Sequence, residues 1–443
     1  MALKGLDIFK LLPKTNCKKC GNPTCMAFAM KVAQGSITID KCPDISAEAL
    51  AQLSDASAPP MKALTIGNGD KQYKLGGETV LFRHDKTFVS KSLYAVTVCE
   101  GCIDEKLPKI KEIDYDRIGE RMIVDLINVE FTGDKAKFLD TVKKAQGAGR
   151  TLILEVKDAD AAKAALDIVK AEKPILNGAD ETNWEAFSKI ATEAGVVLGV
   201  GGKDLDTIYE TVQKIEAAGN KNLAIDVGSV SIKDAFANAV QIRRAALKDQ
   251  DRSFGYPSIV NLHKLAGKDE NLETALASVF TLKYGSIIIL SNMSYATALP
   301  LYGLRQNIYT DPQKPMKMEP KIYPVNGADA DSICAITVDF ALSYFVINGE
   351  LERSGVPVNL IVSDAGGYSV LTSWAAGKFS AGTISKFFKE AGIDGQVKNR
   401  NLLIPGKVAV LKGELEENLP GWKILVGPNE AVGVVKWLKD FKG

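Results

Sequence analysis

The sequence predicts an α/β protein of three units: a small cysteine-rich module, a central (β/α)8 TIM-like barrel and a smaller Rossmann-like domain at the C-terminus. Four of the seven cysteines lie within the first 42 residues. The middle of the chain alternates short β-branched runs with amphipathic segments, and two late apolar runs each lead into a glycine-containing loop. We expect domains at 1–57, 58–318 and 319–443, since a chain of 443 residues has room for two or three.

The first unit is defined by Cys17, Cys20, Cys25 and Cys42, which read C-x2-C-x4-C followed by Cys-Pro. Thiolates are soft ligands, and short loops closed by one distant cysteine suit an iron-sulfur cluster. Zinc is the alternative, but zinc sites usually pair two C-x2-C or Cys/His knuckles. The spacing therefore favours a 4Fe-4S cluster. So small a unit needs metal binding for part of its folding energy.

Composition restricts the partners and the compartment. The formal net charge is +1, which gives no electrostatic case for nucleic acid. No apolar run is long enough for a bilayer span or a signal peptide, so we expect no membrane partner. The cysteines look like ligands rather than disulfides, which favours a reducing, cytoplasmic location. Proline-rich stretches at 56–60 and 311–324 predict a stiff linker and a second join.

The middle unit predicts a barrel because strands and helices alternate over about 240 residues. Helices are expected at 159–171 and 184–194. The candidate strands are 122–129, 151–156, 174–176, 196–200, 222–227, 258–261 and 286–290, with one or two more within 79–98. A doubly wound open sheet stays possible, since periodicity alone does not close a barrel.

The last unit predicts a ligand site at two loops. The apolar strand 356–362 enters the loop 363–369, and the strand 422–426 enters the loop 427–431. Each loop opens a helix, and in a parallel sheet such loops gather at the carboxyl end, where free N–H groups accept ligand oxygens. A lone loop of this kind is more often only a tight turn, but with two in one small domain a ligand site is as good an interpretation as a pair of turns.

Three motifs carry a resemblance over the whole chain. They are LPKTNCKKCGNPTCMAFAMKVAQG at 12–35, KCPD at 41–44 and VSDAGGYSVLTSWAAGKFSAGTISKF at 362–387. With the order of the three units, they resemble the large subunit of the corrinoid iron-sulfur protein of the acetyl-CoA (Wood-Ljungdahl) pathway. The equivalent subunit of the methanogen acetyl-CoA decarbonylase complexes is also similar.

The resemblance implies a methyl carrier rather than an independent catalyst. A cobalamin would lie between the C-terminal domain and a smaller partner subunit. Its Co(I) form would accept methyl from methyltetrahydrofolate through a separate methyltransferase and pass it to CO dehydrogenase/acetyl-CoA synthase. The 4Fe-4S cluster would reduce cobalt that has slipped to Co(II).

The histidines support a corrinoid held base-off, without a protein ligand. The chain has only His84 and His263, neither in the C-terminal unit nor in a D-x-H-x-x-G motif. A lower nitrogen ligand must leave when four-coordinate Co(I) forms, so its absence makes Co(II) easier to reduce.

Small and hydroxyl-bearing residues are the expected corrin contacts, because a flat macrocycle with many amides needs close backbone approach. For any single Ser or Thr, a helix cap is an equally good interpretation. Thr337 and Ser343 are expected on the helix before the strand at 356–362. The candidate contacts are Thr337, Ser343, Gly366, Gly367, Tyr368, Ser369, Val370, Thr372, Ala376, Gly427 and Ala431.

Other polar groups in the barrel are interpreted as structural. Asp125, Glu155, Asp180 and Asp226 lie at or near strand ends, where a barrel enzyme holds catalytic groups, and would suit a pterin-binding methyltransferase. Since the resemblance assigns methyl transfer to other proteins, we expect a scaffold. A ferredoxin-like electron-transfer scaffold and a self-sufficient barrel methyltransferase are the alternative functions.

The remaining cysteines are expected to be structural as well. Cys99 and Cys102 form a second C-x2-C without further ligands or a thioredoxin-like context, which indicates ordinary loop thiols. Cys334 lies in an apolar run, as a core residue does.

Overall fold

The computed structural model describes residues 5–33, 37–50, 60–85, 87–228, 231–267, 269–310 and 316–441. The chain divides into two compact units, one of residues 1–115 and 121–309 and one of 116–120 and 310–443. Residues 56–59 of the expected linker and 311–315 of the expected join lie outside the described residues, as does the end of the first motif at 34–35. The limits at 57 and 318 stay predictions. No helix among the described residues is long and apolar enough to cross a membrane.

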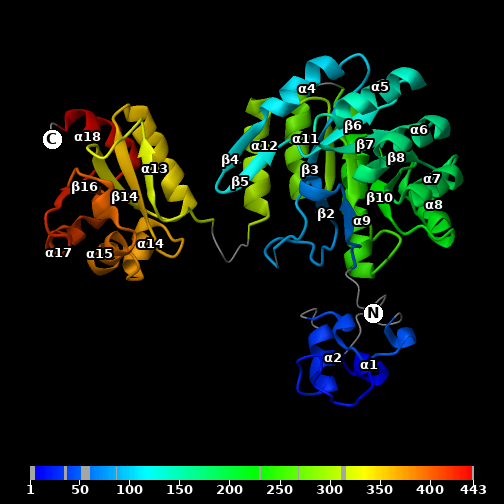
Figure 1. Cartoon of the computed structure of the whole chain (residues 1–443), viewed down its shortest axis with the longest axis horizontal. Coiled ribbons are helices and arrows are strands. Elements are labelled where there is room, and N and C mark those ends of the chain that lie inside the picture. Colours follow the sequence, from blue (N-terminus) through cyan, green and yellow to red (C-terminus); the bar gives the residue numbers. More distant parts are fainter. Residues whose placement is uncertain are drawn as a thin grey trace. The chain divides into compact units, whose positions relative to one another are not determined.

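The cysteine module consists of α1 (Gly5–Leu11), α2 (Cys25–Ala33) and the 3-10 turn η1 (Ile39–Lys41), drawn in blue in Figure 1. The hydroxyl of Thr24 accepts the backbone N–H of Ala27 at 3.1 Å, which satisfies one free donor where α2 begins. Two of the four motif cysteines are buried with the apolar side chains of the module. This core consists of Ile8, Leu12, Cys25, Phe28, Ala29, Val32, Ile39 and Cys42.

The predicted barrel is confirmed: eight parallel strands close in the order β10-β11-β12-β3-β6-β7-β8-β9. The strands are β3 (Leu93–Val98), β6 (Leu126–Glu130), β7 (Thr151–Glu155), β8 (Ile175–Ala179), β9 (Val197–Val200), β10 (Leu223–Asp226), β11 (Ser258–Asn261) and β12 (Ile287–Leu290). The main outer helices are α4 (Ile103–Glu112), α5 (Lys135–Gln146), α6 (Ala159–Val169), α7 (Trp184–Ala194), α8 (Leu205–Ala217), α9 (Ile232–Arg244), α11 (Glu270–Leu282) and α12 (Tyr295–Ile308), several of which Figure 1 shows around the strands.

The prediction of one continuous strand at 122–129 is wrong. This segment is divided into β5 (Glu120–Ile123), which pairs with β4 (Asp114–Arg117), and the barrel strand β6. Ile118 and Gly119 between β4 and β5 both have positive φ, 53° and 68°. Two consecutive left-handed residues make the tight turn that a hairpin needs. Residue 124 and Asp125 then lead into the barrel.

A second hairpin closes the amino-terminal end of the barrel. β1 (Leu64–Ile66) pairs antiparallel with β2 (Tyr73–Leu75). Leu64, Ile66 and Leu75 pack in one cluster with residues that begin barrel strands, such as Leu93 and Leu126. The carboxyl end of the barrel, where ligands bind in this fold, stays open.

The C-terminal unit is a five-stranded sheet in the order β13-β15-β14-β16-β17, in which only β13 runs antiparallel. The strands are β13 (Ile322–Val325), β14 (Ile333–Val338), β15 (Val358–Ser363), β16 (Asn401–Ile404) and β17 (Lys423–Val426). Cys334 and Ile336 face one core while Ile333 and Ala335 face the other, as the two-residue period of a strand requires.

Helices cover both faces of this sheet, which makes it Rossmann-like. α15 (Ala381–Glu390) and α17 (Lys412–Asn418) pack on one face, and α13 (Ala341–Ser354) and α18 (Val434–Asp440) pack on the other. The chain runs from β14 outward to β15 and then returns past β14 to β16. The strand order therefore reverses between β14 and β16, and such a switch point is where open α/β sheets bind ligands.

Candidate functional site

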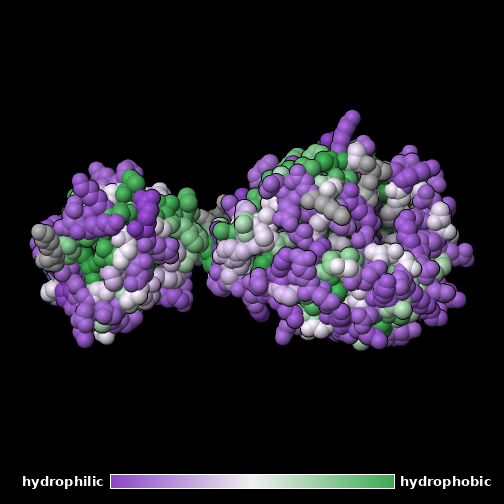
Figure 2. All heavy atoms as spheres, turned by 90° about the horizontal axis from the view of Figure 1, so that it is seen from above, coloured by the Kyte–Doolittle hydropathy of each residue, from purple (hydrophilic) through white to green (hydrophobic). Residues whose placement is uncertain are grey.

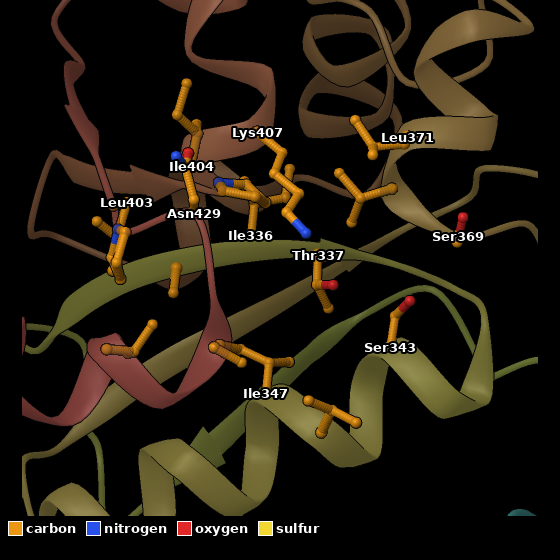
Figure 3. A pocket seen from close by; sticks show the side chains of 18 of the residues that line it. Ile336, Thr337, Ser343, Ile347, Ser369, Leu371, Leu403, Ile404, Lys407 and Asn429 are labelled. Carbon is orange, nitrogen blue, oxygen red and sulfur yellow. The ribbon is translucent and has the colours of Figure 1, made fainter.

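A cavity of about 370 Å³ lies at this switch point, at the carboxyl ends of β14, β16 and β17 (Figure 3). It lies between α13 and α14 (Val370–Ala375), whose residues supply two of its walls. Its lining is mainly apolar. The lining residues are Ala335, Ile336, Thr337, Phe340, Leu342, Ser343, Val346, Ile347, Ser369, Val370, Leu371, Leu403, Ile404, Pro405, Lys407, Gly427, Pro428, Asn429, Ala431 and Val434.

Six of the eleven predicted corrin contacts line this cavity. They are Thr337, Ser343, Ser369, Val370, Gly427 and Ala431. The expected position of Thr337 on a helix is wrong: it lies in β14, because the six-residue run at 333–338 is buried throughout as a central strand. Ser343 does lie on α13. Figure 3 shows both hydroxyls at the same side of the cavity.

The other five predicted contacts shape the neighbouring loop or helix. Gly366 and Gly367 have φ values of 78° and 77°, which favour glycine. The Tyr368 ring stacks under the Lys378 ammonium at 4.6 Å. On α14, the Thr372 hydroxyl lies 3.0 Å from that of Ser369. Ala376 directly follows the helix.

Sequence reasoning missed the groups that the strands β16 and β17 bring to the cavity. Lys407 is the only cationic side chain among the described lining residues, and Figure 3 shows it reaching toward Thr337. Its ammonium also pairs with Glu430 at 2.8 Å. Asn429 adds an amide. The strand Asn401–Ile404 followed by Pro405 was the available signal, because an apolar run entering Pro-Gly marks a strand end.

Large apolar side chains near the cavity are exposed. Leu342 is 61% and Val346 is 51% exposed on α13, and Leu371 and Trp374 on α14 are 44% and 42% exposed. Apolar atoms also gather on the face of the C-terminal unit that Figure 2 shows. Such clustered exposure indicates a binding surface rather than ordinary solvent contact.

The cysteine loop holds an unusual backbone. Lys14, Asn16 and Lys18 all have φ between 49° and 61°. Left-handed residues other than glycine cost of order 1–3 kcal/mol each and gather at functional sites. The Asn16 side-chain oxygen accepts the Cys25 backbone N–H at 2.8 Å, while the Asn16 N–H donates to the Cys25 sulfur at 3.4 Å. This reciprocal pair fixes one thiol of the motif.

The four thiols lie near enough to influence one another. Burial raises the pKa of Cys42, and the other three thiols raise it further. Across the motif, the Lys19 ammonium contacts Asp44 at 2.9 Å and ties the first loop to the last cysteine. Within the described residues, no three His, Cys, Asp or Glu side chains are gathered around the position of a single metal ion. The ligands of a cluster are bound to different irons, so they lie further apart than those of one zinc ion.

The barrel carboxylates fall into two groups. Asp125 precedes β6, at the amino end of the barrel and not at the end where a barrel enzyme holds catalytic groups; there its Oδ2 accepts Arg305 Nη1 at 2.6 Å. Glu155, Asp180 and Asp226 line an opening at the carboxyl end of the barrel instead.

In the described part of the chain, no group of metal-ligand side chains surrounds the remaining cysteines. The sulfurs of Cys99 and Cys102 lie 2.9 Å apart, and burial raises the pKa of Cys102 to about 11. Cys334 is buried in the C-terminal core, as expected.

Comparison with known proteins decides the family. The family described as CO dehydrogenase/acetyl-CoA synthase delta subunit matches residues 63–438, and an Fe-S cluster family matches residues 12–43. The corrinoid/iron-sulfur protein large subunit of Moorella thermoacetica is 39% identical over 99% of both chains. The chain belongs to this family of corrinoid/iron-sulfur protein large subunits.

Archaeal relatives are also similar over nearly their whole length. The acetyl-CoA decarbonylase/synthase complex subunit gamma of Methanothermobacter thermautotrophicus is 31% identical over 99% of both chains. That of Archaeoglobus fulgidus is 32% identical over 98% of this chain and 97% of its own. The resemblance stated from the motifs is confirmed, and the N-terminal module is an Fe-S cluster domain.

Proposed function

We propose that this protein is the methyl-carrying subunit of the acetyl-CoA pathway, with a 4Fe-4S cluster in the cysteine module and a base-off corrinoid at the C-terminal unit. The observation that carries the proposal is the cavity at the switch point, in a chain that is similar over its whole length to a protein named for a corrinoid and iron-sulfur. When bound, the corrinoid supplies a cobalt centre that takes up and releases a methyl group. Cys17, Cys20, Cys25 and Cys42 would hold the 4Fe-4S cluster, which would supply the one electron that returns Co(II) to Co(I).

The residues of the C-terminal unit fit the parts of a corrinoid. The cavity is mainly apolar, with neutral donors at Thr337 and Ser343. Lys407 would meet the phosphate of the nucleotide tail, since it is the cation among the described lining residues. The exposed Leu371 and Leu342 flank the cavity and would meet the flat macrocycle or the partner's surface. No histidine of the C-terminal unit can bind cobalt, because the unit contains none.

The cysteine module fits a cluster that exchanges electrons. Cys17 is exposed, whereas Cys25 and Cys42 are buried, so one edge of the ligand set reaches the surface. The N–H of Asn16 directed at the Cys25 sulfur is a contact that tunes a cluster's reduction potential. We propose Cys17, Cys20, Cys25 and Cys42 as the four ligands.

The proposal implies three protein partners. They are a small corrinoid iron-sulfur subunit that forms a heterodimer with this chain, a methyltetrahydrofolate methyltransferase, and CO dehydrogenase/acetyl-CoA synthase. The higher identity to the bacterial relative, 39% against 31–32%, favours this set of partners over the archaeal complex.

Electron paramagnetic resonance on the heterodimer, purified without oxygen, tests the proposal. We expect a base-off Co(II) signal that disappears as a reduced 4Fe-4S signal grows on mild reduction. Iron without cobalt in every redox state, confirmed by metal analysis, would overturn the carrier role in favour of an electron-transfer scaffold.

Two cysteine variants provide a matched test of the ligands. Cys25→Ser should lower the iron content, because it removes a ligand, whereas Cys334→Ser in the other unit should leave iron unchanged. Equal iron in the two variants would contradict the ligand assignment.

A further inference from the structure

The open end of the barrel holds a second cavity, of about 580 Å³. It shares no lining residue with the cavity of the C-terminal unit. Polar side chains at the carboxyl ends of neighbouring strands supply much of its lining, in the place where barrels of this kind bind ligands. The lining residues are Glu130, Phe131, Glu155, Val156, Lys157, Asn177, Gly178, Ala179, Asp180, Glu181, Gly201, Gly202, Lys203, Asp226, Gly228 and Lys264.

One lining residue, Asp226, has a carboxylate that can accept further hydrogen bonds. Asp226 Oδ2 accepts Asn177 Nδ2 at 3.1 Å, and Asp226 Oδ1 accepts the backbone N–H of Gly228 at 3.0 Å. In the described part of the chain, no cationic side chain forms an ion pair with Asp226. A carboxylate offers about four lone-pair sites, so each oxygen of Asp226 keeps about one for a ligand. Burial raises the pKa of this carboxyl.

The neighbouring carboxylate is already satisfied. Glu155 accepts Asn128 Nδ2 at 2.6 Å and Asn261 Nδ2 at 3.0 Å, and it also pairs with the Lys264 ammonium. These contacts come from three other elements of the barrel and hold Glu155 in place. Asp226, by contrast, keeps acceptor sites that a ligand can use.

Glycines keep the space around Asn177 and Asp226 open. A Cβ at Gly199 would lie 2.1 Å from Asn177 Oδ1, so only glycine there leaves room for the amide. The register of β8 shifts between Asn177 and Ala179, and bulges of this kind redirect side chains beside active sites. A Cβ at Gly201 would lie 3.6 Å from Asp226 Cβ, so the bare backbone leaves space next to the carboxylate.

We propose that this cavity binds a planar heterocycle that presents a ring N–H and an exocyclic amino group side by side, as the 2-amino-4-oxopyrimidine ring of a pterin does. Asp226 accepts both N–H groups, one on each oxygen, in the parallel arrangement that carboxylates form with guanidinium groups. Asn177, with one N–H and its oxygen still available, pairs with the adjoining edge of the ring. The cavity volume lies within the range of small-ligand sites. The inference goes beyond the methyl-carrier proposal and does not rest on it.

Titration of the full-length protein with pterin, monitored by the fluorescence of the pterin, tests the proposal. Lumazine is the matched control, because a carbonyl replaces the 2-amino group of the same ring system. We expect saturable pterin binding and at least about tenfold weaker binding of lumazine, since one charge-assisted hydrogen bond is lost. Absence of pterin binding at millimolar concentration, or equal affinity for the two rings, would overturn the inference.

Three variants locate the binding. Asp226→Asn should weaken pterin binding at least about tenfold, and Gly201→Ala should weaken it by narrowing the cavity without a positive-φ penalty. Asp206→Asn, exposed on α8, is the control and should bind as the parent does. Thermal melting shows which variants fold; should Asp226→Asn not fold, Gly201→Ala decides. Parental pterin affinity in the folded variants would contradict the assignment.

Discussion

Asp339, which directly follows β14, accepts the backbone N–H of Gly367 at 2.9 Å and so anchors the loop that follows the neighbouring strand. The same Oδ1 atom accepts the N–H of Ala365 at 3.0 Å. The side chain of Asp339 is only 1% exposed, and the Lys317 ammonium lies 3.5 Å from its other oxygen. One buried carboxylate therefore holds the glycine loop beside the C-terminal cavity.

Replacing Asp339 should loosen this loop. Asp339→Ala leaves two buried N–H groups unsatisfied, which costs on the order of 3 kcal/mol of unfolding free energy. We expect lower cobalt content per iron, measured by metal analysis, and a lower midpoint of urea unfolding. Asp331→Ala is the control, since its ion pair with Lys398 at 3.6 Å is exposed and contributes at most about 1 kcal/mol. Full cobalt content in Asp339→Ala would show that the loop does not hold the corrinoid.

Thr337 tests whether the C-terminal cavity is the corrinoid site. Thr337→Leu extends the side chain at the end of β14 into the cavity, so the cobalt-to-iron ratio should fall severalfold. Thr337→Val keeps the shape and removes only the hydroxyl, so a smaller loss is expected. A parental cobalt content in Thr337→Leu would place the corrinoid elsewhere, and equal losses in the two variants would point to the hydroxyl rather than to space.

The barrel was predictable because its strands are almost entirely buried and therefore appear as short apolar runs. The run at 258–261 matches β11 at both ends, and the expected helix 184–194 matches α7. The hairpin β1–β2 escaped prediction because strands of three residues are too short to show periodicity. Thr337 was assigned to a helix because a continuous apolar run does not distinguish a central strand from a buried helix.

The composition of the cavity was less predictable, because sheet order decides it. Ser369 and Gly427 were found from loops that follow strong strands. Lys407 and Asn429 come to the same cavity only because β16 lies between β14 and β17, which no local pattern reveals. Likewise, the pairing of Asn177 with Asp226 depends on the barrel bringing β8 and β10 to one opening.

Breaking the Arg305–Asp125 ion pair should destabilise the barrel strongly, because both side chains are buried away from water. The two side chains are 4% and 6% exposed, and Arg305 Nη1 also donates to the Ser92 carbonyl at 3.1 Å. Arg305→Met leaves the buried Asp125 charge without its guanidinium partner, at a cost of about 3–5 kcal/mol. Adding Asp125→Asn removes the charge, so the double variant should be more stable than Arg305→Met in urea unfolding. A double variant less stable than Arg305→Met would contradict a dominant role for the buried charge of Asp125.

Glu216 on α8 should stabilise the barrel at neutral pH, and this stabilisation should be lost in acid. Burial alone would raise the pKa of Glu216, but hydrogen bonds from Lys62 at 2.7 Å, Tyr256 at 2.6 Å and Ser253 at 2.8 Å outweigh it and hold the pKa below its usual value. A depressed folded-state pKa stabilises the protein fully above the unfolded-state pKa of about 4.3, and this stabilisation is lost as the pH falls through the folded-state value.

Glu216→Gln removes that contribution at every pH. We expect the free energy of unfolding, measured with urea, to be about 1–3 kcal/mol lower than that of the parent protein at pH 7. This difference should narrow as the pH falls below about 4.3. Glu210→Gln, exposed on the same helix, should stay within about 0.5 kcal/mol of the parent throughout. A difference in unfolding free energy that stays constant with pH would contradict a role for the charge of Glu216. The shape of the side chain would then hold Lys62 and the segment before β1 against the barrel.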